Sequence, residues 1–242
     1  MAKYLITGVA GFIGSNLLER LLDLGHEVTG LDNFSNGKRE NLAFVDRHSA
    51  HSKFTLIEGD IRDLDTCHKA CEGVEFVLHQ AALGSVPRSV KDPILYEENN
   101  AIGHLNMLVA ARDAKVHRFV YASSSSVYGD TDVLPKVETM APRPKSPYAI
   151  SKISGEYFSK SFYELYGLET IGFRYFNVFG PKQDPNSQYS AAIPKFVTAL
   201  LANEAPTIYG DGEQTRDFTY IDNVLAANLA ACECDNPKVF GD

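Results

Sequence analysis

Residues 7–14 of the chain read Thr7-Gly8-Val9-Ala10-Gly11-Phe12-Ile13-Gly14, and they join a short apolar run to a stretch in which leucines recur at helical spacing. The glycines follow the pattern G-x-x-G-x-x-G, one residue wider than the common dinucleotide fingerprint. Glycine permits a tight turn and a close approach of the backbone to a pyrophosphate, and the helix that follows offers free N–H groups. The segment therefore predicts a strand–turn–helix unit that binds a dinucleotide.

Apolar runs and amphipathic stretches continue to alternate after this unit. The predicted strands are residues 4–6, 28–31, 54–57, 74–78, 118–122 and 170–175, and the predicted helices include 63–72, 92–114 and 147–166. Continuous apolar strands that alternate with helices are typical of a parallel sheet covered on both faces. The predicted fold class is therefore α/β, with a doubly wound parallel sheet of the Rossmann type.

The alternation changes after Tyr175, which divides the predicted chain into two parts. Residues 1–176 are predicted to form the dinucleotide-binding Rossmann domain, and residues 177–242 a small, incomplete substrate-binding part. The second part is predicted to contain a helix at 193–203 and a short strand at 207–209. A last helix, at 222–233, is expected to pack back on the first domain.

Composition and charge limit the possible functions. The 242 residues include 23 Lys and Arg against 31 Asp and Glu, which gives a net charge of −8, and 44% of the residues are hydrophobic. The acidic balance argues against a nucleic acid or an anionic membrane surface as the main partner. The sequence has no apolar run of about 18 residues, and its N-terminus leads directly into a predicted strand, with no room for a signal peptide. We therefore expect a cytoplasmic protein.

The cysteines indicate neither a disulfide scaffold nor a metal site. Cys67 and Cys71 are far in sequence from Cys232 and Cys234, and no pair of histidines matches the spacing of a zinc site. We expect buried thiols and no bound metal.

Three predicted strands end in residues that suit a nucleotide. Asp32 closes the second strand, where a carboxylate accepts hydrogen bonds from a ribose diol and repels a 2′-phosphate, so NAD is favoured over NADP. Asp60 and Ile61 follow the third strand and could flank an adenine. Gln80-Ala81-Ala82 follows the fourth strand and supplies small residues where a cofactor would pass.

A candidate acid–base site lies further along the chain. Tyr148-Ala-Ile-Ser-Lys152 is in a predicted helix, where residues i and i+4 share a face, and Ser123 to Ser126 ends the fifth strand. A tyrosine with a pKa of about 10 is a poor base at neutral pH. A nearby ammonium and the positive nicotinamide ring would lower that pKa, and a facing serine hydroxyl could hold a substrate oxygen or relay a proton.

Together these motifs resemble the extended short-chain dehydrogenase/reductase family, in particular its NAD-dependent nucleotide-sugar epimerases. The resemblance covers essentially the whole chain and includes Tyr121-Ala-Ser-Ser-Ser-Ser-Val-Tyr-Gly129, Arg174-Tyr-Phe-Asn-Val-Phe-Gly-Pro181 and Gly210-Asp-Gly-Glu-Gln-Thr-Arg-Asp-Phe218. Two further segments are less specific, and they look most like UDP-N-acetylglucosamine 4-epimerases: Gln80-Ala-Ala-Leu-Gly-Ser-Val-Pro-Arg-Ser89 and Gln183-Asp-Pro-Asn186.

The resemblance implies a role for each matching residue. The implied catalytic set is Ser124, Tyr148 and Lys152, with Ser125 as the fallback if the serine run is offset by one. The implied cofactor neighbours are Gly8, Gly11, Phe12, Ile13, Gly14, Asp32, Asn33, Asp60, Ile61, Gln80, Ala81, Ala82, Asn99, Tyr148, Lys152 and Tyr175. The implied substrate neighbours are Gly84, Ser85, Ser124, Tyr148, Asn177, Gln183 and Arg216. Asn177 would hold a diphosphate or sugar oxygen, and Arg216 would pair with the diphosphate.

The implied activity is NAD-dependent 4-epimerisation of a UDP-hexose, in particular UDP-N-acetylglucosamine, through a transient 4-keto sugar. Tyr148 would take the 4-hydroxyl proton while C4 passes hydride to tightly held NAD⁺, and the hydride would return to the other face of the sugar. Relatives commonly dimerise through the two long helices, so a homodimer is expected.

Two alternatives stay open. A nucleotide-sugar 4,6-dehydratase or uronate decarboxylase typically places an acid beside the serine or threonine at the strand tip, where this chain has Ser125 and Ser126. The second alternative is a non-catalytic NAD-binding protein. The short C-terminal part favours it, because members of the family usually continue well beyond this point, whereas the intact set of Ser124, Tyr148 and Lys152 argues against it. A chain that ends at Asp242 is expected to hold NAD but to epimerise UDP-sugars poorly.

Overall fold

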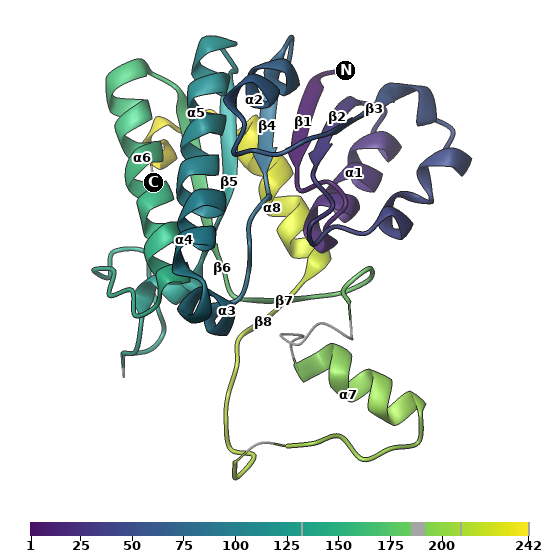
Figure 1. Cartoon of the computed structure of the whole chain (residues 1–242), viewed down its shortest axis with the longest axis vertical. Helices are drawn as coiled ribbons and strands as arrows, with labels where there is room; N and C mark the ends of the chain where they lie inside the picture. The colour runs from purple at the N-terminus through teal and green to yellow at the C-terminus, as the bar shows by residue number, and fades with distance from the viewer. Residues whose placement is uncertain (132, 185–191, 209, 242) are drawn as a thin grey trace.

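The main sheet consists of parallel strands in the order β3-β2-β1-β4-β5-β6 (Figure 1). The computed structural model describes residues 1–131, 133–184, 192–208 and 210–241. The strands are β1 (Lys3–Thr7), β2 (Glu27–Asp32), β3 (Phe54–Glu58), β4 (Phe76–His79), β5 (Arg118–Ser124) and β6 (Glu169–Tyr175). Each was predicted to within two residues at either end. The order reverses between β1 and β4, and ligands of such sheets bind at the carboxyl ends of the strands flanking this point.

Helices cover both faces of the sheet. One face packs against α1 (Phe12–Asp23) and α8 (Ile221–Glu233). The other face packs against α2 (Leu64–Cys71), α5 (Gly103–Asp113) and α6 (Pro147–Tyr166). Alternate side chains of β1 divide between the two cores, with Tyr4 and Ile6 in the first and Leu5 in the second. This arrangement confirms the predicted doubly wound α/β fold.

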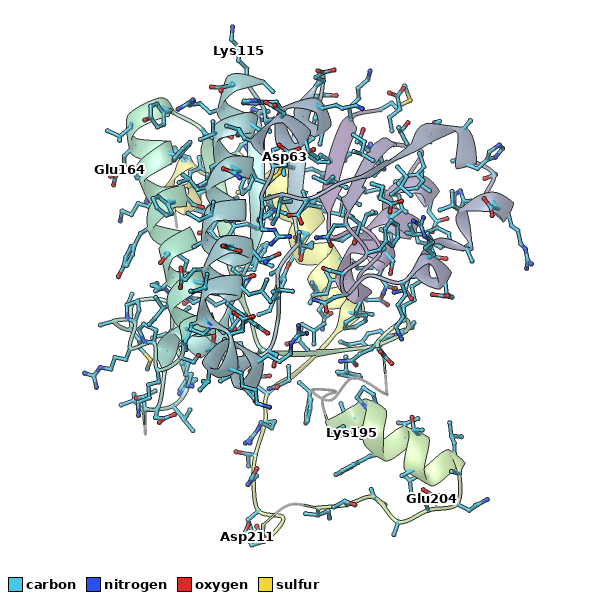
Figure 2. All side chains as sticks on the ribbon, in the orientation of Figure 1. Asp63, Lys115, Glu164, Lys195, Glu204 and Asp211 are labelled. Atoms are coloured by element: carbon cyan, nitrogen blue, oxygen red, sulfur yellow. The ribbon has the colours of Figure 1, made fainter. Side chains whose placement is uncertain are left out.

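Capping residues explain why α2 and α6 keep close to their predicted bounds. Asp63 (Figure 2) caps α2 by accepting a hydrogen bond from the amide two residues on, at 3.2 Å. Ser146 caps α6 by accepting a hydrogen bond from Ala149 N (3.1 Å), three residues on, and Pro147 occupies the first helical position. Gly167, with φ +71°, ends α6 in the left-handed conformation that glycine adopts without strain.

The predicted helix 92–114 is interrupted in the structure. α4 (Pro93–Tyr96) is separated from α5 by a π-helical segment, Glu97–Ile102, which contains two buried asparagines. The side chain of Asn100 accepts from Leu83 N (2.8 Å) and donates to Leu83 O (3.0 Å), so this segment fixes the loop that follows β4. α3 (Val86–Lys91), in that same region, was not predicted.

Short 3₁₀ turns lie in the loops of the sheet domain and near the C-terminal end. They are Arg39–Leu42, Val45–Arg47, His51–Lys53, Ser125–Tyr128 and Pro237–Val239.

The chain leaves the sheet after β6 and returns to it through α8. β7 (Asn177–Phe179) pairs in parallel with β8 (Phe218–Tyr220), and α7 (Ala192–Leu201) lies between them in sequence. α7 lies apart from the sheet in Figure 1, as do the labelled side chains of Lys195, Glu204 and Asp211 in Figure 2.

Between β6 and α8, the described residues contain the predicted helix but not the predicted strand. The predicted helix 193–203 corresponds to α7, whereas the β7–β8 pair was not predicted. The predicted strand 207–209 is wrong for Thr207 and Ile208, which lie outside any strand, and Tyr209 lies outside the described residues. Residues 185–190, which include Asn186 of the segment Gln183-Asp-Pro-Asn186, also lie outside the described residues.

The buried guanidinium of Arg118 connects the end of α8 to the sheet. Arg118 of β5 donates to Ala231 O and Cys232 O, both at 2.8 Å, which are carbonyls of the last turn of α8. It also pairs with Glu169 of β6 (Nη2–Oε2 2.6 Å), and its guanidinium lies 4.7 Å from the ring centre of Phe240. Arg118 therefore satisfies a helix end and holds the segment that follows it.

The described residues include neither a membrane-spanning helix nor a cluster of metal ligands. No helix in the described ranges is both long and apolar enough to cross a bilayer. Those ranges also contain no group of three or more His, Cys, Asp or Glu side chains placed to hold a metal. Cys67, Cys71 and Cys232 are buried, and burial raises the pKa of each thiol to about 12.

Candidate active site

A pocket opens at the carboxyl ends of β1, β2 and β4, where the strand order reverses. The predicted cofactor neighbours that line it are Gly8, Gly11, Asp32, Asn33, Ile61, Gln80, Ala81, Ala82 and Asn99. Sequence reasoning missed the lining residues Leu31, Ser35, Asn36, Gly37, Gly59 and Leu83. Most of these come from the loops after β2, β3 and β4, where a conformation rather than a motif brings them to the pocket.

The glycine-rich turn forms one wall of the pocket. Gly8 has φ +67°, and a Cβ atom there would lie 2.9 Å from the backbone of Ala81. A Cβ atom at Gly14 would lie 2.2 Å from the carbonyl oxygen of Gly8. Both positions therefore require glycine. The N–H groups of Phe12, Ile13 and Gly14 are in the first turn of α1, where they have no partner within the helix and fit a pyrophosphate.

Asp32 is buried at the end of β2 with its carboxylate held by the backbone. Oδ2 accepts a hydrogen bond from Ala10 N (2.9 Å), and Oδ1 accepts one from Phe34 N (2.8 Å). Burial raises the pKa of Asp32, and these two bonds oppose the rise. Each oxygen has a further lone pair, so the fixed carboxylate can accept from the hydroxyls of a ribose.

Asp60 supports a pocket residue and does not itself line the pocket. Its Oδ2 accepts from the amide of Asn33 (2.9 Å) and from Arg62 Nη2 (2.8 Å). The Arg62 hydrogen bond lowers the pKa of Asp60 to about 2. Asp60 therefore contacts Asn33, which lines the pocket, and does not itself reach the position where we predicted a contact with the cofactor.

Asn228 of α8 links two of the predicted cofactor neighbours. Its Nδ2 donates to the hydroxyl of Tyr175 (2.7 Å) and to Val224 O (2.7 Å), and its Oδ1 accepts from Gln80 Nε2 (3.2 Å). Gln80 Oε1 is then buried without a partner among the described residues. This acceptor beside the glycine turn fits a dinucleotide, whose polar groups can donate to it.

Sequence reasoning missed Asn228. It is fully buried in α8, which is otherwise apolar on its inner face. A lone asparagine among buried aliphatic residues was the available signal, since a buried amide is retained where it has hydrogen-bond partners. Burial also raises the pKa of its partner Tyr175 to about 12, so this tyrosine stays a phenol at neutral pH.

Ser124 and Tyr148 meet at the tip of β5. The Ser124 hydroxyl accepts hydrogen bonds from the amide (3.2 Å) and the hydroxyl (2.9 Å) of Ser126. A hydrogen bond from Ser124 also acts on Tyr148 and lowers the pKa of that phenol. Ser125 begins the following 3₁₀ turn. The structure therefore brings Ser124, and not the fallback Ser125, to Tyr148.

Lys152 lies one turn after Tyr148 on α6. Its Nζ donates to Ala122 O (2.8 Å) on β5, and burial lowers the pKa of Lys152 to about 8. Burial raises the pKa of Tyr148, and this outweighs the hydrogen bond from Ser124. Loss of solvation is therefore the largest influence on the Tyr148 pKa in the protein alone, whereas the lowering that we predicted depends on the nicotinamide ring as well as on the Lys152 ammonium.

The predicted substrate residues fall in different places. Ser85 caps α3 by accepting from Arg88 N (3.2 Å), and Gly84 before it faces open space. Gln183 donates to Val178 O (3.2 Å), while its Oε1 is buried without a partner in the described part of the chain. These three residues lie in segments that lead away from β4 and β7.

Two further predicted substrate residues, Asn177 and Arg216, lie in or near the β7–β8 pair. Asn177 donates to Asp217 O (3.0 Å). Arg216 is exposed, and its guanidinium donates to Thr215 O (2.7 Å) and to Gln214 Oε1 (3.0 Å), both within its own loop. The structure does not bring Arg216 to the pocket.

The fold, and a Tyr–Lys pair on α6 beside a dinucleotide pocket, define a short-chain dehydrogenase/reductase of the extended type. The model of the "NAD dependent epimerase/dehydratase family" matches residues 4–240. The chain belongs to this family, and its cofactor is NAD.

Relatives within this family carry several activities. A putative UDP-glucose 4-epimerase of Methanocaldococcus jannaschii is 39% identical over 97% of this chain and 75% of its own length. The solved UDP-N-acetylglucosamine 4-epimerase of Methanobrevibacter ruminantium, in complex with UDP-N-acetylmuramic acid, is 43% identical with a TM-score of 0.91, over 97% of this chain and 74% of its own. A dTDP-glucose 4,6-dehydratase of Streptomyces venezuelae, solved with NAD bound, is 34% identical with a TM-score of 0.85, over 95% and 72%. The chain thus spans about three quarters of the length of each.

Proposed function

We propose that the protein catalyses the NAD-dependent 4-epimerisation of a UDP-hexose. The observation that carries this proposal is the meeting of Ser124, Tyr148 and Lys152 at the tip of β5, with no carboxylate next to Ser124 in the serine run. A proton acceptor and a hydroxyl donor are thereby held beside the pocket that fits NAD.

The chain's own residues supply binding and proton transfer. The glycine turn, Asp32 and Gln80 would hold NAD, which when bound accepts a hydride from the sugar and gives it back. Tyr148 would remove the proton of the 4-hydroxyl group and later return it to the 4-keto oxygen. Ser124 would hold that oxygen by its hydroxyl, and Lys152 would supply positive charge near the phenolate.

The substrate that we propose is UDP-N-acetylglucosamine, interconverted with UDP-N-acetylgalactosamine. Support comes from the two segments that resemble UDP-N-acetylglucosamine 4-epimerases, which begin at Gln80 and Gln183. The buried, unpartnered Oε1 of Gln183 could accept a hydrogen bond from a sugar hydroxyl or N-acetyl group. We also propose that residues 177–242, apart from α8, form the substrate-binding part and residues 1–176 the NAD-binding domain.

The rival activities give different products. A 4,6-dehydratase or uronate decarboxylase would use an acid beside Ser124, and a non-catalytic protein would bind NAD and convert nothing. Incubation of the protein and NAD with UDP-N-acetylglucosamine, followed by chromatography and NMR of the sugar, distinguishes them. We expect the C4 epimer. A dehydrated sugar, or an unchanged substrate in the presence of bound NAD, would contradict the proposal.

Asp32 leads to a prediction about cofactor choice. We expect NADH to bind more tightly than NADPH by about tenfold or more, because the 2′-phosphate would face a fixed carboxylate and like charges repel. Fluorescence titration with both nucleotides measures this ratio. Asp32→Asn should narrow the ratio, and equal affinities in the unmodified protein would rule out this role for Asp32.

We further propose a homodimer formed through the helices on the α5–α6 face. Apolar side chains are exposed along this face, notably Ile102, Ile150, Tyr157 and Leu165. Their burial against a second copy would remove apolar surface from water. A monomeric mass in solution would contradict this proposal.

A further inference from the structure

One face of α6 contacts the last three residues of β5. The contacting residues, Tyr148, Lys152 and Glu156, are spaced four apart and so lie on the same side of the helix. Tyr148 interacts with Ser124, Lys152 Nζ donates to Ala122 O (2.8 Å), and Glu156 accepts a hydrogen bond from the hydroxyl of Ser123. The helix therefore holds the strand tip at three consecutive positions.

Glu156 is fixed in place by an ion pair with β6. Arg174 donates from Nε to Oε1 (3.0 Å) and from Nη2 to Oε2 (2.7 Å), a bidentate contact with a defined geometry. The side chains of Arg174 and Glu156 are only 19% and 14% exposed. The Arg174 guanidinium also lies 4.8 Å from the ring centre of Tyr128, and the pKa of Arg174 is raised, chiefly by its bond to Glu156.

Among the described residues, few charged groups lie near Lys152. The titratable and charged groups around it are His79 of β4, His104 of α5, Tyr148 and Glu156 of α6 and, behind Glu156, Arg174 of β6. Burial lowers the pKa of both histidines, that of His104 to about 3, so neither carries charge at neutral pH. Burial also lowers the pKa of Lys152, and the negative charge of Glu156 acts in the opposite direction.

We propose that Glu156 is a positioning residue for the candidate catalytic set: it anchors the tip of β5 to α6 and supplies the negative charge that keeps Lys152 in its ammonium form. Arg174 holds Glu156 in position and moderates its charge. The inference rests on the proposed function only for the role of Lys152 in catalysis, because the contacts and the charges exist without substrate.

Two substitutions that break the same ion pair test the proposal. Glu156→Gln keeps an acceptor for Ser123 and removes the negative charge, whereas Arg174→Gln removes the positive charge and keeps the Glu156 carboxyl group. NMR titration of isotopically labelled lysine, with Lys152→Met to assign the signal, measures the pKa of Lys152 without any turnover. We expect Glu156→Gln to lower it by about 1 unit and Arg174→Gln to raise it.

The opposite signs separate an electrostatic role from a structural one. A loss of packing alone would move the pKa of Lys152 in the same direction in both variants, and that result, or no shift in Glu156→Gln, would overturn the proposal. Glu164→Gln makes the same change two turns along α6 at an exposed position (Figure 2) and should leave the pKa of Lys152 unchanged. Ser123→Ala should do the same, since it removes only the hydrogen bond.

The pH profile of turnover adds a readout that depends on catalysis. Lys152 must stay protonated to act as a cation, so activity is lost as the pH rises through its pKa. Glu156→Gln should move this alkaline limb to lower pH, and Arg174→Gln should move it to higher pH. A protein that shows the NMR shifts but no epimerisation would refute the proposed function and leave the role of Glu156 intact.

Discussion

Replacement of Tyr148 by phenylalanine is expected to reduce the turnover of UDP-sugar epimerisation by about 10²–10⁴, the usual contribution of a positioned acid–base group. The phenol oxygen is the group that meets Ser124 at the tip of β5, and phenylalanine removes that oxygen alone. The ring keeps its edge-on contact with Tyr96, at 6.4 Å between ring centres, so α6 should remain in place. NAD binding should therefore be nearly unchanged while turnover falls.

The same helix supplies the control for this variant. Tyr157→Phe makes an identical change on α6, nine residues along the helix from Tyr148, at a side chain that is 62% exposed. Turnover of both variants is measured with NAD occupancy determined in parallel by absorbance or fluorescence. Near-normal turnover in Tyr148→Phe would place the base elsewhere, and an equal loss in Tyr157→Phe would indicate a general defect of the helix.

Replacement of Arg118 by methionine should lower the free energy of unfolding by about 3 kcal/mol or more. Methionine fills much of the same volume but leaves Ala231 O and Cys232 O without their donor and removes the Arg118 partner of Glu169. Urea unfolding, followed by circular dichroism, measures the change. A loss below about 1 kcal/mol would mean that water satisfies these groups and that the buried cation contributes little.

Arg20→Met is the matched control for Arg118. Arg20 also pairs with α8, through Asp222 at 3.7 Å, but both side chains are substantially exposed. An exposed ion pair of this kind contributes about 0–1 kcal/mol, so the loss of stability should be small. The difference between the two variants compares a buried, hydrogen-bonded arginine with an exposed one that contacts the same helix.

Local sequence signals predicted the sheet because each signal acts within one strand–helix unit. The glycine turn at Gly8–Gly14 and the short apolar runs of the strands each specify the backbone conformation of residues close to them in sequence. The β7–β8 pair escaped prediction because each strand has three residues and its partner lies about 40 positions away in sequence. The π-helical segment at Glu97–Ile102 likewise has no pattern of apolar residues that distinguishes it from a regular helix.

The candidate site divides in the same manner. Asp32, Tyr148 and Lys152 were predicted because strand-end position and helical spacing are visible in the sequence. Glu156 and Asn228 were not predicted, since their importance depends on contacts with Arg174 and Gln80 on other elements. Arg216 was implied by resemblance alone, and its hydrogen bonds in the structure stay within residues 214–216.

β7 pairs with β8, and Asn177 lies opposite Phe218 in this pair, so the two ends of the segment between the strands are held together. β6 precedes this pair directly and α8 follows it directly, so both ends of the segment are fixed to the main sheet. Doubling the length of a flexible loop adds only about 0.6 kcal/mol to the entropy of closing it. Under the proposed division of the chain, insertions in this segment would alter which sugar is recognised while the NAD-binding domain keeps its stability, so that substrate choice could evolve independently of the fold.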